Sequence, residues 1–175
     1  MKAIDTCVLI WGIRGHLQEG REDLVERCRT LIEIYKRRHE AIMVPSVVLA
    51  EYLCGFSLDL QKIQRAYLES NFFVAPFDAA AAAIAAEIYD RLVMDERRLA
   101  GTGRQCLKAD LEIIATSIAH GASHIYTDNF DDFNALGKGR IIVERIPENE
   151  PDRTEPTPPR AGNLELFPDD SGDGS

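Results

Sequence analysis

Residues 2–6 of the chain read Lys2-Ala3-Ile4-Asp5-Thr6. This short apolar run is suited to a buried β-strand, and it ends at a carboxylate. Asp5 is the only charged side chain between Lys2 and Arg14. The sequence therefore places an isolated acid at the C-terminal end of the first predicted strand.

Further predicted strands alternate with predicted helices along the chain. Apolar residues at helical spacing predict helices at 22–38, 46–56, 59–70, 78–99 and 108–120. Short apolar runs predict strands at 41–44, 72–75, 124–127 and 141–146. Strands that alternate with helices predict an α/β fold with three layers, α/β/α, around a central, mainly parallel sheet.

The 175 residues divide into two parts of different composition. Hydrophobic residues make up 45% of the chain and charged residues 28%, which is typical of a globular protein. Residues 1–146 are expected to form one domain. Residues 147–175 are rich in proline, glycine and acids and are expected to be disordered, with one apolar island at residues 164–167. The apolar stretches are too short for a membrane helix, and Asp5 interrupts any export signal, so we expect a cytoplasmic protein without a membrane partner.

The net charge of −9 excludes binding of nucleic acid through an overall basic surface. Residues 147–175 hold eight acids and two arginines, which leaves 21 acids and 18 bases in residues 1–146. Contact with phosphates would have to come from a local cluster. The preferred cluster surrounds the glycines of residues 101–103 and consists of Arg97, Arg98, Arg104 and Lys108. Arg97 and Arg98 are equally well explained as cations at the end of a helix.

Four acids occupy positions where a core residue is expected: Asp5, Glu51, Asp110 and Asp128. Glu51 is the single charge in residues 41–58, and a lone buried carboxylate is costly. Asp110 continues the apolar stripe of residues 113, 114, 117 and 118, at a predicted helix start that favours an anion. Asp128 follows a strand, and ligands of parallel sheets bind at the carboxyl ends of strands.

Each acid also has a structural explanation. Asp128 fits a turn, Asp110 a helix cap, Glu51 a partner for a buried arginine, and Asp5 an acceptor for loop amides. Several carboxylates that converge without enough bases, however, call for a hard divalent cation with oxygen ligands, such as Mg²⁺ or Mn²⁺. The four histidines show no zinc-binding spacing, and the four cysteines form no C-x-x-C pair.

The order and spacing of four segments resemble those of a known family, the PIN-domain ribonucleases, and within it the VapC-type toxins of bacterial and archaeal toxin–antitoxin pairs. The resemblance runs through nearly all of residues 1–146. It rests on Ile4-Asp5-Thr6, on Pro45-Ser46-Val47-Val48-Leu49-Ala50-Glu51, on Lys108-Ala109-Asp110-Leu111-Glu112-Ile113-Ile114-Ala115, and on Ile125-Tyr126-Thr127-Asp128-Asn129-Phe130-Asp131-Asp132-Phe133.

The resemblance implies a hydrolase, an endoribonuclease that cleaves single-stranded RNA with Mg²⁺ or Mn²⁺. It implies that Asp5, Asp110 and Asp128 hold the metal and that Glu51 completes the catalytic set; whether one or two ions bind stays open. Asp131 and Asp132 compete with Asp128 for the last metal-facing position, which we assign to Asp128. The implied partners are the RNA substrate, a cognate antitoxin protein and a second copy of the chain in a homodimer.

Two other readings compete with a nuclease. The first is a noncatalytic PIN-fold scaffold that binds RNA or protein and holds a metal in an acidic pocket. The second group comprises phosphatases with an aspartyl nucleophile and receiver domains. A phosphatase would need an acid where Cys7 stands, and a receiver domain would need paired acids after its first strand. All four acids of a nuclease are present, which favours the enzyme over the scaffold.

Overall fold

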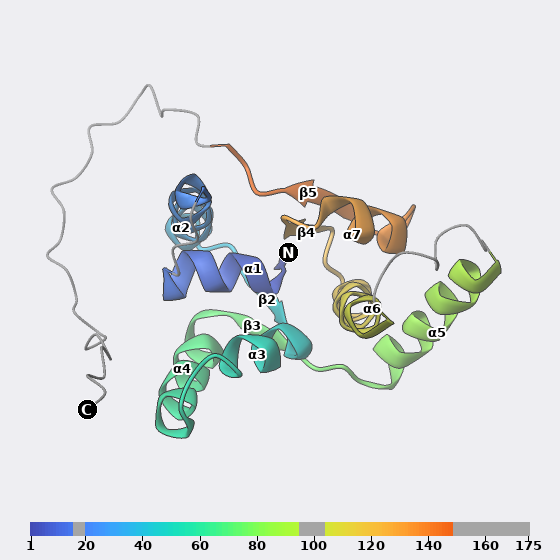
Figure 1. Cartoon of the computed structure of the whole chain (residues 1–175), viewed down its shortest axis with the longest axis horizontal. Coiled ribbons are helices and arrows are strands. Elements are labelled where there is room, and N and C mark those ends of the chain that lie inside the picture. Colours follow the sequence, from blue (N-terminus) through green and yellow to red (C-terminus); the bar gives the residue numbers. More distant parts are fainter. Residues whose placement is uncertain (16–19, 95–103, 149–175) are drawn as a thin grey trace, which may run out of the picture.

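The computed structural model describes residues 1–15, 20–94 and 104–148, which contain a five-stranded sheet (Figure 1). The strand order is β3-β2-β1-β4-β5, and all neighbours run parallel. The strands are β1 (Lys2–Ile4), β2 (Ile42–Pro45), β3 (Phe73–Ala75), β4 (His124–Thr127) and β5 (Ile142–Arg145). The prediction of an α/β fold with a parallel sheet is confirmed.

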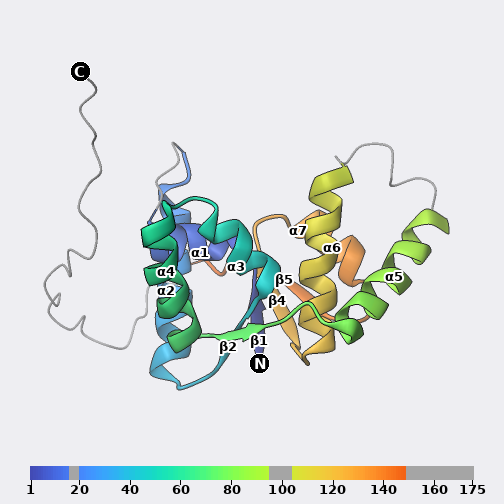
Figure 2. The same ribbon diagram turned by 90° about the horizontal axis from the view of Figure 1, so that it is seen from below.

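Helices lie on both sides of the sheet (Figures 1 and 2). On one side are α1 (Thr6–Leu9), which continues into the π-helical turn η1 (Ile10–Arg14), α2 (Glu22–Arg37), α3 (Ser46–Leu53) and α4 (Leu58–Asn71). On the other side are α5 (Ala79–Met94), α6 (Arg104–Ala119) and α7 (Phe130–Gly137). No helix within the described ranges is long and apolar enough to cross a lipid bilayer.

The central strand β1 places the first acid at the carboxyl edge of the sheet. β1 pairs with β2 on one side and with β4 on the other. The backbone N–H of Asp5 donates to the carbonyl of Tyr126 at 3.0 Å, which extends the pairing with β4 by one residue. The chain leaves β1, β2 and β4 at the same edge, because parallel strands point the same way. The segments that begin with Asp5, Ser46 and Asp128 therefore start close to one another.

Four helical elements, α6, α1, η1 and α7, differ from the sequence prediction. Helix α6 begins at Arg104, four residues before the predicted start. Residues 6–14 form α1 and η1, for which no element was predicted, and residues 130–137 form α7 where a turn was one reading. In α7 the buried Phe133 and Leu136 lie three residues apart, and the acids of the first turn suit a helix N-terminus. The predicted helix at 78–99 is observed to Met94; its last five residues, and the tail from residue 149, lie outside the described ranges.

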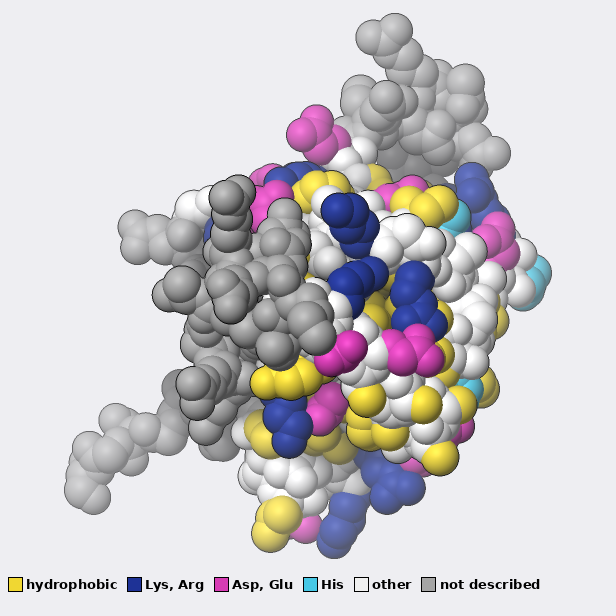
Figure 3. Space-filling view, turned by 90° about the vertical axis from the view of Figure 1, so that its right-hand side faces the viewer, with side chains coloured by type: hydrophobic (Ala, Val, Ile, Leu, Met, Phe, Trp, Pro, Cys, Tyr) yellow, Lys and Arg dark blue, Asp and Glu magenta, His cyan; other side chains and the backbone are white. Residues whose placement is uncertain are grey.

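Helix α5 is fastened to the end of α7 by two arginines. Arg91 donates to the carbonyls of Ala135, Leu136 and Lys138, which satisfies acceptors at the C-terminus of α7. Arg140 pairs with Glu87 at 2.9 Å. Figure 3 shows the side of the molecule where α5 and α6 lie, with Lys and Arg side chains beside Asp and Glu side chains. This mixture of signs agrees with the absence of an overall basic character in the sequence.

Phe133 tests how far the fold depends on α7. Its side chain is fully buried, so Phe133→Ala should lower the free energy of unfolding by about 3–5 kcal/mol because of lost burial and the cavity left behind. Phe73→Ala is the matched control, since Phe73 is 43% exposed and should cost less than about 1 kcal/mol. Urea unfolding followed by circular dichroism measures both. Equal losses for the two variants would show that α7 does not anchor the core.

Candidate active site

Asp5 is held as a buried carboxylate by three donors. Its side chain directly follows β1 and is 8% exposed. Oδ1 accepts from the backbone N–H of Thr6 at 2.6 Å, and Oδ2 accepts from the Thr127 hydroxyl at 2.7 Å and from the Cys7 thiol at 3.4 Å. Burial raises the pKa of Asp5, and these donors oppose that rise. The predicted isolated acid at the end of β1 is therefore present, and its surroundings are polar.

Thr6 connects Asp5 to Glu51. Its backbone N–H binds Asp5, and its hydroxyl donates to Glu51 Oε2. Glu51 lies on α3, which follows β2, so the connection joins the ends of two neighbouring strands. Glu51 is exposed rather than buried, which corrects the expectation of a buried lone charge.

Asn129 and Thr127 connect Asp5 to Asp110. The Asn129 side-chain amide donates to Asp110 Oδ2 at 3.2 Å, and its backbone N–H donates to Thr127 Oγ1 at 3.0 Å. Thr127 is fully buried, and its hydroxyl donates a hydrogen bond to Asp5. A continuous series of hydrogen bonds therefore runs from Asp110 on α6, through the end of β4 and the end of β1, to Glu51 on α3.

The charges of this cluster repel one another. The pKa of Asp110 is raised to about 7, first by burial and then by the negative charges of Asp5, Asp132 and Glu51, while the hydrogen bond from Asn129 opposes the shift. Because α6 begins at Arg104, Asp110 lies in the second turn, beyond the first turn in which the helix dipole was expected to stabilise it.

Asp128 is the predicted acid for which the structure shows an ion pair. Its Oδ2 accepts from Arg21 Nη1 in an ion pair, and Arg21 also lies 5.7 Å from the ring centre of Trp11. Asp132, on the first turn of α7, is instead among the charges that act on Asp110. Asp131 is 93% exposed and lies 4.0 Å from Arg145. The structure thus brings together Asp5, Glu51 and Asp110 with Asp132, and pairs Asp128 with an arginine.

Asn129, Asp132 and Arg21 are the residues of the site that the sequence prediction did not select. Asn129 and Asp132 both stand in the segment Thr127-Asp128-Asn129-Phe130-Asp131-Asp132-Phe133, which was singled out as a whole. Had this segment been predicted as a helix, the adjacent acids Asp131 and Asp132 would have been expected to point in different directions. Arg21 carries no sequence signal, because its partner lies 107 positions away.

Of the predicted RNA-binding residues, only Lys108 has a described side chain. Lys108 is exposed, two residues before Asp110, and its Nζ lies 3.9 Å from Glu112 Oε1. Arg104 is the first residue of α6, and its side chain lies outside the described part, as do Arg97 and Arg98 entirely.

Residues 2–139 match the model of the PIN domain, which covers most of the chain. The chain belongs to the PIN domain family. The resemblance drawn from the four sequence segments is therefore confirmed at the level of the family. Comparison with curated proteins gave no match.

Three solved structures resemble this PIN domain. VapBC2 from Rickettsia felis, bound to a DNA fragment from its promoter, gives a TM-score of 0.60 at 19% identity, over 82% of this chain and 97% of the other. DNA-bound VapBC from Salmonella typhimurium gives 0.54 at 20% identity, over 82% and 96%. VapBC-5 from Mycobacterium tuberculosis, a member of the VapBC family of toxin–antitoxin systems, gives 0.44 at 22% identity, over 83% and 96%. The first two establish a shared fold.

The donor set of the PIN domain fits a hard divalent cation in its chemistry. Asp5, Glu51, Asp110 and Asp132 offer only carboxylate oxygens, and their mutual repulsion is the condition that a doubly charged ion relieves. In their present rotamers, no three His, Cys, Asp or Glu side chains of the described residues converge tightly enough to hold a metal. Asp110 Oδ2 and Glu51 Oε2 are instead turned to Asn129 and Thr6. Binding would require these carboxylates to rotate toward one another.

Replacement of Thr127 tests the link between β4 and Asp5. Thr127→Val keeps the shape of the side chain but removes the donor to a buried carboxylate, so the free energy of unfolding at pH 7 should fall by about 2 kcal/mol. Thr116→Val is the matched control: Thr116 is equally buried, but its hydroxyl donates only to the Glu112 carbonyl within its own helix. Urea unfolding measures both. A loss at Thr116 as large as at Thr127 would contradict a special role for the bond to Asp5.

The crowding at Asp110 predicts a pH-dependent gain in stability for Asp110→Asn. Since the folded protein raises the pKa of Asp110 from its ordinary 3.8 to about 7, the ionised carboxylate destabilises the fold increasingly as the pH rises from 4 to 7. Removing the charge should stabilise the protein at pH 8 by about 2 kcal/mol, roughly half of what three pKa units correspond to, after allowance for solvent screening.

At pH 4 the same substitution should have little effect, because the carboxyl group is then largely protonated in the folded protein. Thermal unfolding in the presence of a chelator between pH 4 and pH 8 measures the difference. Asp131→Asn, at an exposed position on α7, is the control and should show no such rise. A gain at Asp110 that does not vary with pH would rule out repulsion as its cause.

Proposed function

We propose that this PIN domain is a metal-dependent endoribonuclease that hydrolyses phosphodiester bonds of single-stranded RNA in the cytoplasm. The observation that carries the proposal is the convergence of Asp5, Glu51 and Asp110, remote in sequence, on one hydrogen-bonded series at the carboxyl edge of the sheet. Membership of the family supports the same conclusion. An edge at which burial and neighbouring charges raise the pKa of Asp5 and Asp110 is typical of a functional site rather than a structural one.

Asp5 and Asp110 are proposed to hold Mg²⁺ or Mn²⁺, with Asp132 as the further carboxylate. Asp128 was the sequence-based choice for that position, and its pairing with Arg21 now favours Asp132. When bound, such an ion lowers the pKa of a water molecule and polarises the scissile phosphate. The hydrogen bonds from Thr127 and Thr6 fix the orientation of Asp5.

Glu51 is proposed to orient and deprotonate the attacking water. It is exposed, so a water molecule can reach it, and its Oε2 is fixed by the hydroxyl of Thr6. The second oxygen, Oε1, accepts no hydrogen bond from the described residues and can take a proton. Glu51 therefore combines access with a defined position, which Asp5 does not because it is buried.

RNA is proposed to approach from the N-terminal end of α6. Lys108 is exposed close to Asp110, and the series Arg97, Arg98 and Arg104 precedes it in the sequence. Since phosphates are repelled by the acidic cluster, cations beside it are needed to hold the backbone.

The protein is further proposed to be the toxin of a type II toxin–antitoxin pair, with a cognate antitoxin and a homodimeric state. The shared fold with VapBC from two organisms supports this assignment. An antitoxin could block the site by inserting a basic side chain among Asp5, Glu51 and Asp110, because that cluster lacks a cation of its own among the described residues.

The test is cleavage of single-stranded RNA by the full chain with Mn²⁺, with Mg²⁺ and with a chelator. Asp5→Asn and Asp110→Asn should each lower the rate by about 100-fold or more, since each removes a proposed ligand. Asp132→Asn should have a comparable effect, whereas Asp131→Asn, the adjacent exposed acid, should leave the rate within about twofold. A noncatalytic scaffold would give no metal-dependent product at all.

Asp128→Asn decides between the two candidates for the last carboxylate. With Asp132 as the metal-facing group, Asp128→Asn should change the rate much less than Asp132→Asn. The reverse order would return the role to Asp128 and would mean that its ion pair with Arg21 opens before RNA is cleaved.

A further inference from the structure

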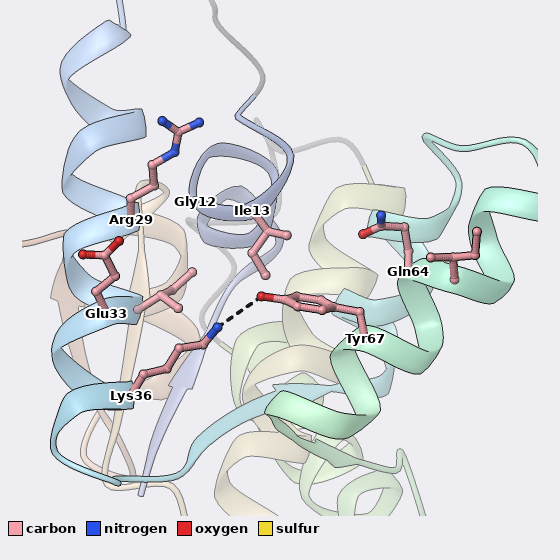
Figure 4. Close-up of a pocket in the computed structure, with 9 residues that line it drawn as sticks. Gly12, Ile13, Arg29, Glu33, Lys36, Gln64 and Tyr67 are labelled. Atoms are coloured by element: carbon pink, nitrogen blue, oxygen red, sulfur yellow. Dashed lines mark hydrogen bonds between the residues drawn. The ribbon is translucent and has the colours of Figure 1, made fainter. Parts of the chain in front are cut away.

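A groove lies between η1, α2 and α4 (Figure 4). Its volume is about 350 Å³, at the lower end of the range for ligand-binding pockets. Three isoleucines, Ile13, Ile32 and Ile63, supply apolar surface from the three elements. Ile63 is 60% exposed and Tyr67 beside it 36%, so the apolar surface is open to solvent.

The shape of the groove is set by close packing and by a hydrogen bond between its helices. Gly12 lets η1 approach α2 closely: a Cβ atom at this position would lie 2.8 Å from Ile32 Cδ1 and 3.2 Å from the backbone of Cys28. At one end Lys36 Nζ donates to the Tyr67 hydroxyl at 3.1 Å, which bridges α2 and α4 (Figure 4). The depression is therefore bounded by fixed contacts on two sides.

Charge and shape define what the groove can accept. Arg29 and Lys36 stand against the single acid Glu33 on the α2 side, so the rim carries a net positive charge. A suitable occupant is a short peptide with a few apolar side chains and acidic neighbours, because the volume fits several side chains but not a folded domain.

The chain itself contains such a peptide. Residues 164–170 read Leu164-Glu165-Leu166-Phe167-Pro168-Asp169-Asp170, three large apolar residues with acids between and after them. In residues 149–175 the acids outnumber the bases, with Glu150, Asp152, Glu155, Glu165, Asp169, Asp170 and Asp173 against Arg153 and Arg160. The apolar island and its acids complement the isoleucines and the basic rim.

The end of the described chain lies within reach of the groove. Arg27 on α2 donates to the carbonyls of Ile146 and Pro147. The last described residues therefore lie beside the helix that supplies Arg29 and Lys36. From Arg27 to Lys36 is about 14 Å along the helix at 1.5 Å per residue. Residues 149–163 can span up to about 50 Å when extended, enough to pass around a helix about 10 Å wide.

We propose that residues 164–167 dock in this groove within the same chain. The leucines and the phenylalanine cover the exposed Ile63 and the apolar floor beside it, and the acids lie against Arg29 and Lys36. While docked, the segment excludes any other protein from this face of the domain. The proposal does not depend on the nuclease chemistry, since the groove shares no residue with the acidic cluster.

The test uses the full chain and amide hydrogen exchange. If the island docks, the amides of residues 164–167 are protected, and Ile63→Glu makes them exchange about tenfold or more faster by placing an acid in the groove. Leu58→Glu is the matched control, an acid at a 77% exposed apolar position on the same helix that does not line the groove. It should leave the exchange unchanged.

The second measurement starts from the tail. Triple substitution Leu164→Ser, Leu166→Ser and Phe167→Ser should shift the methyl NMR signals of Ile13, Ile32 and Ile63 but not that of Ile142, which is exposed on β5. Unprotected amides and unshifted methyl signals would overturn the proposal and leave the groove to another protein. Protection that disappears on 100-fold dilution would also overturn it, in favour of the tail of a second copy.

Discussion

The burial of a charge at the end of the central strand is the constraint on which the site depends. The backbone of Asp5 continues the pairing of β1 with β4, so its side chain is held in place beside the sheet. Asp5 is only 8% exposed to solvent. An ionised group there requires donors, and Thr6 and Thr127 supply them. Thr127 ends β4 and also accepts from the backbone of Asn129. The need of the Asp5 carboxylate for donors therefore restricts the conformation of the chain after β1 and after β4.

The remaining acids add negative charge rather than remove it. Asp110 lies where burial and the charges of Asp5, Asp132 and Glu51 raise its pKa, and among the described residues the amide of Asn129 opposes that rise. A protein selected for stability alone would gain by replacing Asp110 with a neutral residue. The retention of a destabilising arrangement at the carboxyl edge of a parallel sheet is explained by a function that needs the charges together.

The sequence predicted the five strands and the helices α2 to α6, and it selected acids at the end of β1 and on α3 and α6, because isolated charges and apolar periodicity are local signals. After β4 it selected Asp128, whereas the structure pairs Asp128 with Arg21 and has Asp132 among the charges that act on Asp110. Asp128 and Asp132 are four residues apart, and their directions depend on whether α7 forms and on where Arg21 lies, both of which are set by tertiary contacts.

The pairing of Asp128 with Arg21 also limits the charge of the site. One acid is neutralised by the arginine, which additionally lies against the Trp11 ring. Asp110 and the three acids that act on it form no ion pair with an arginine or lysine among the described residues. An RNA phosphate is itself an anion and is repelled by this cluster. Under the proposed function, the cluster is neutralised by a cation before RNA approaches, and a protein that supplies the cation from its own side chain closes the site to RNA. In that proposal, substrate binding and inhibition are two outcomes of the same uncompensated charge.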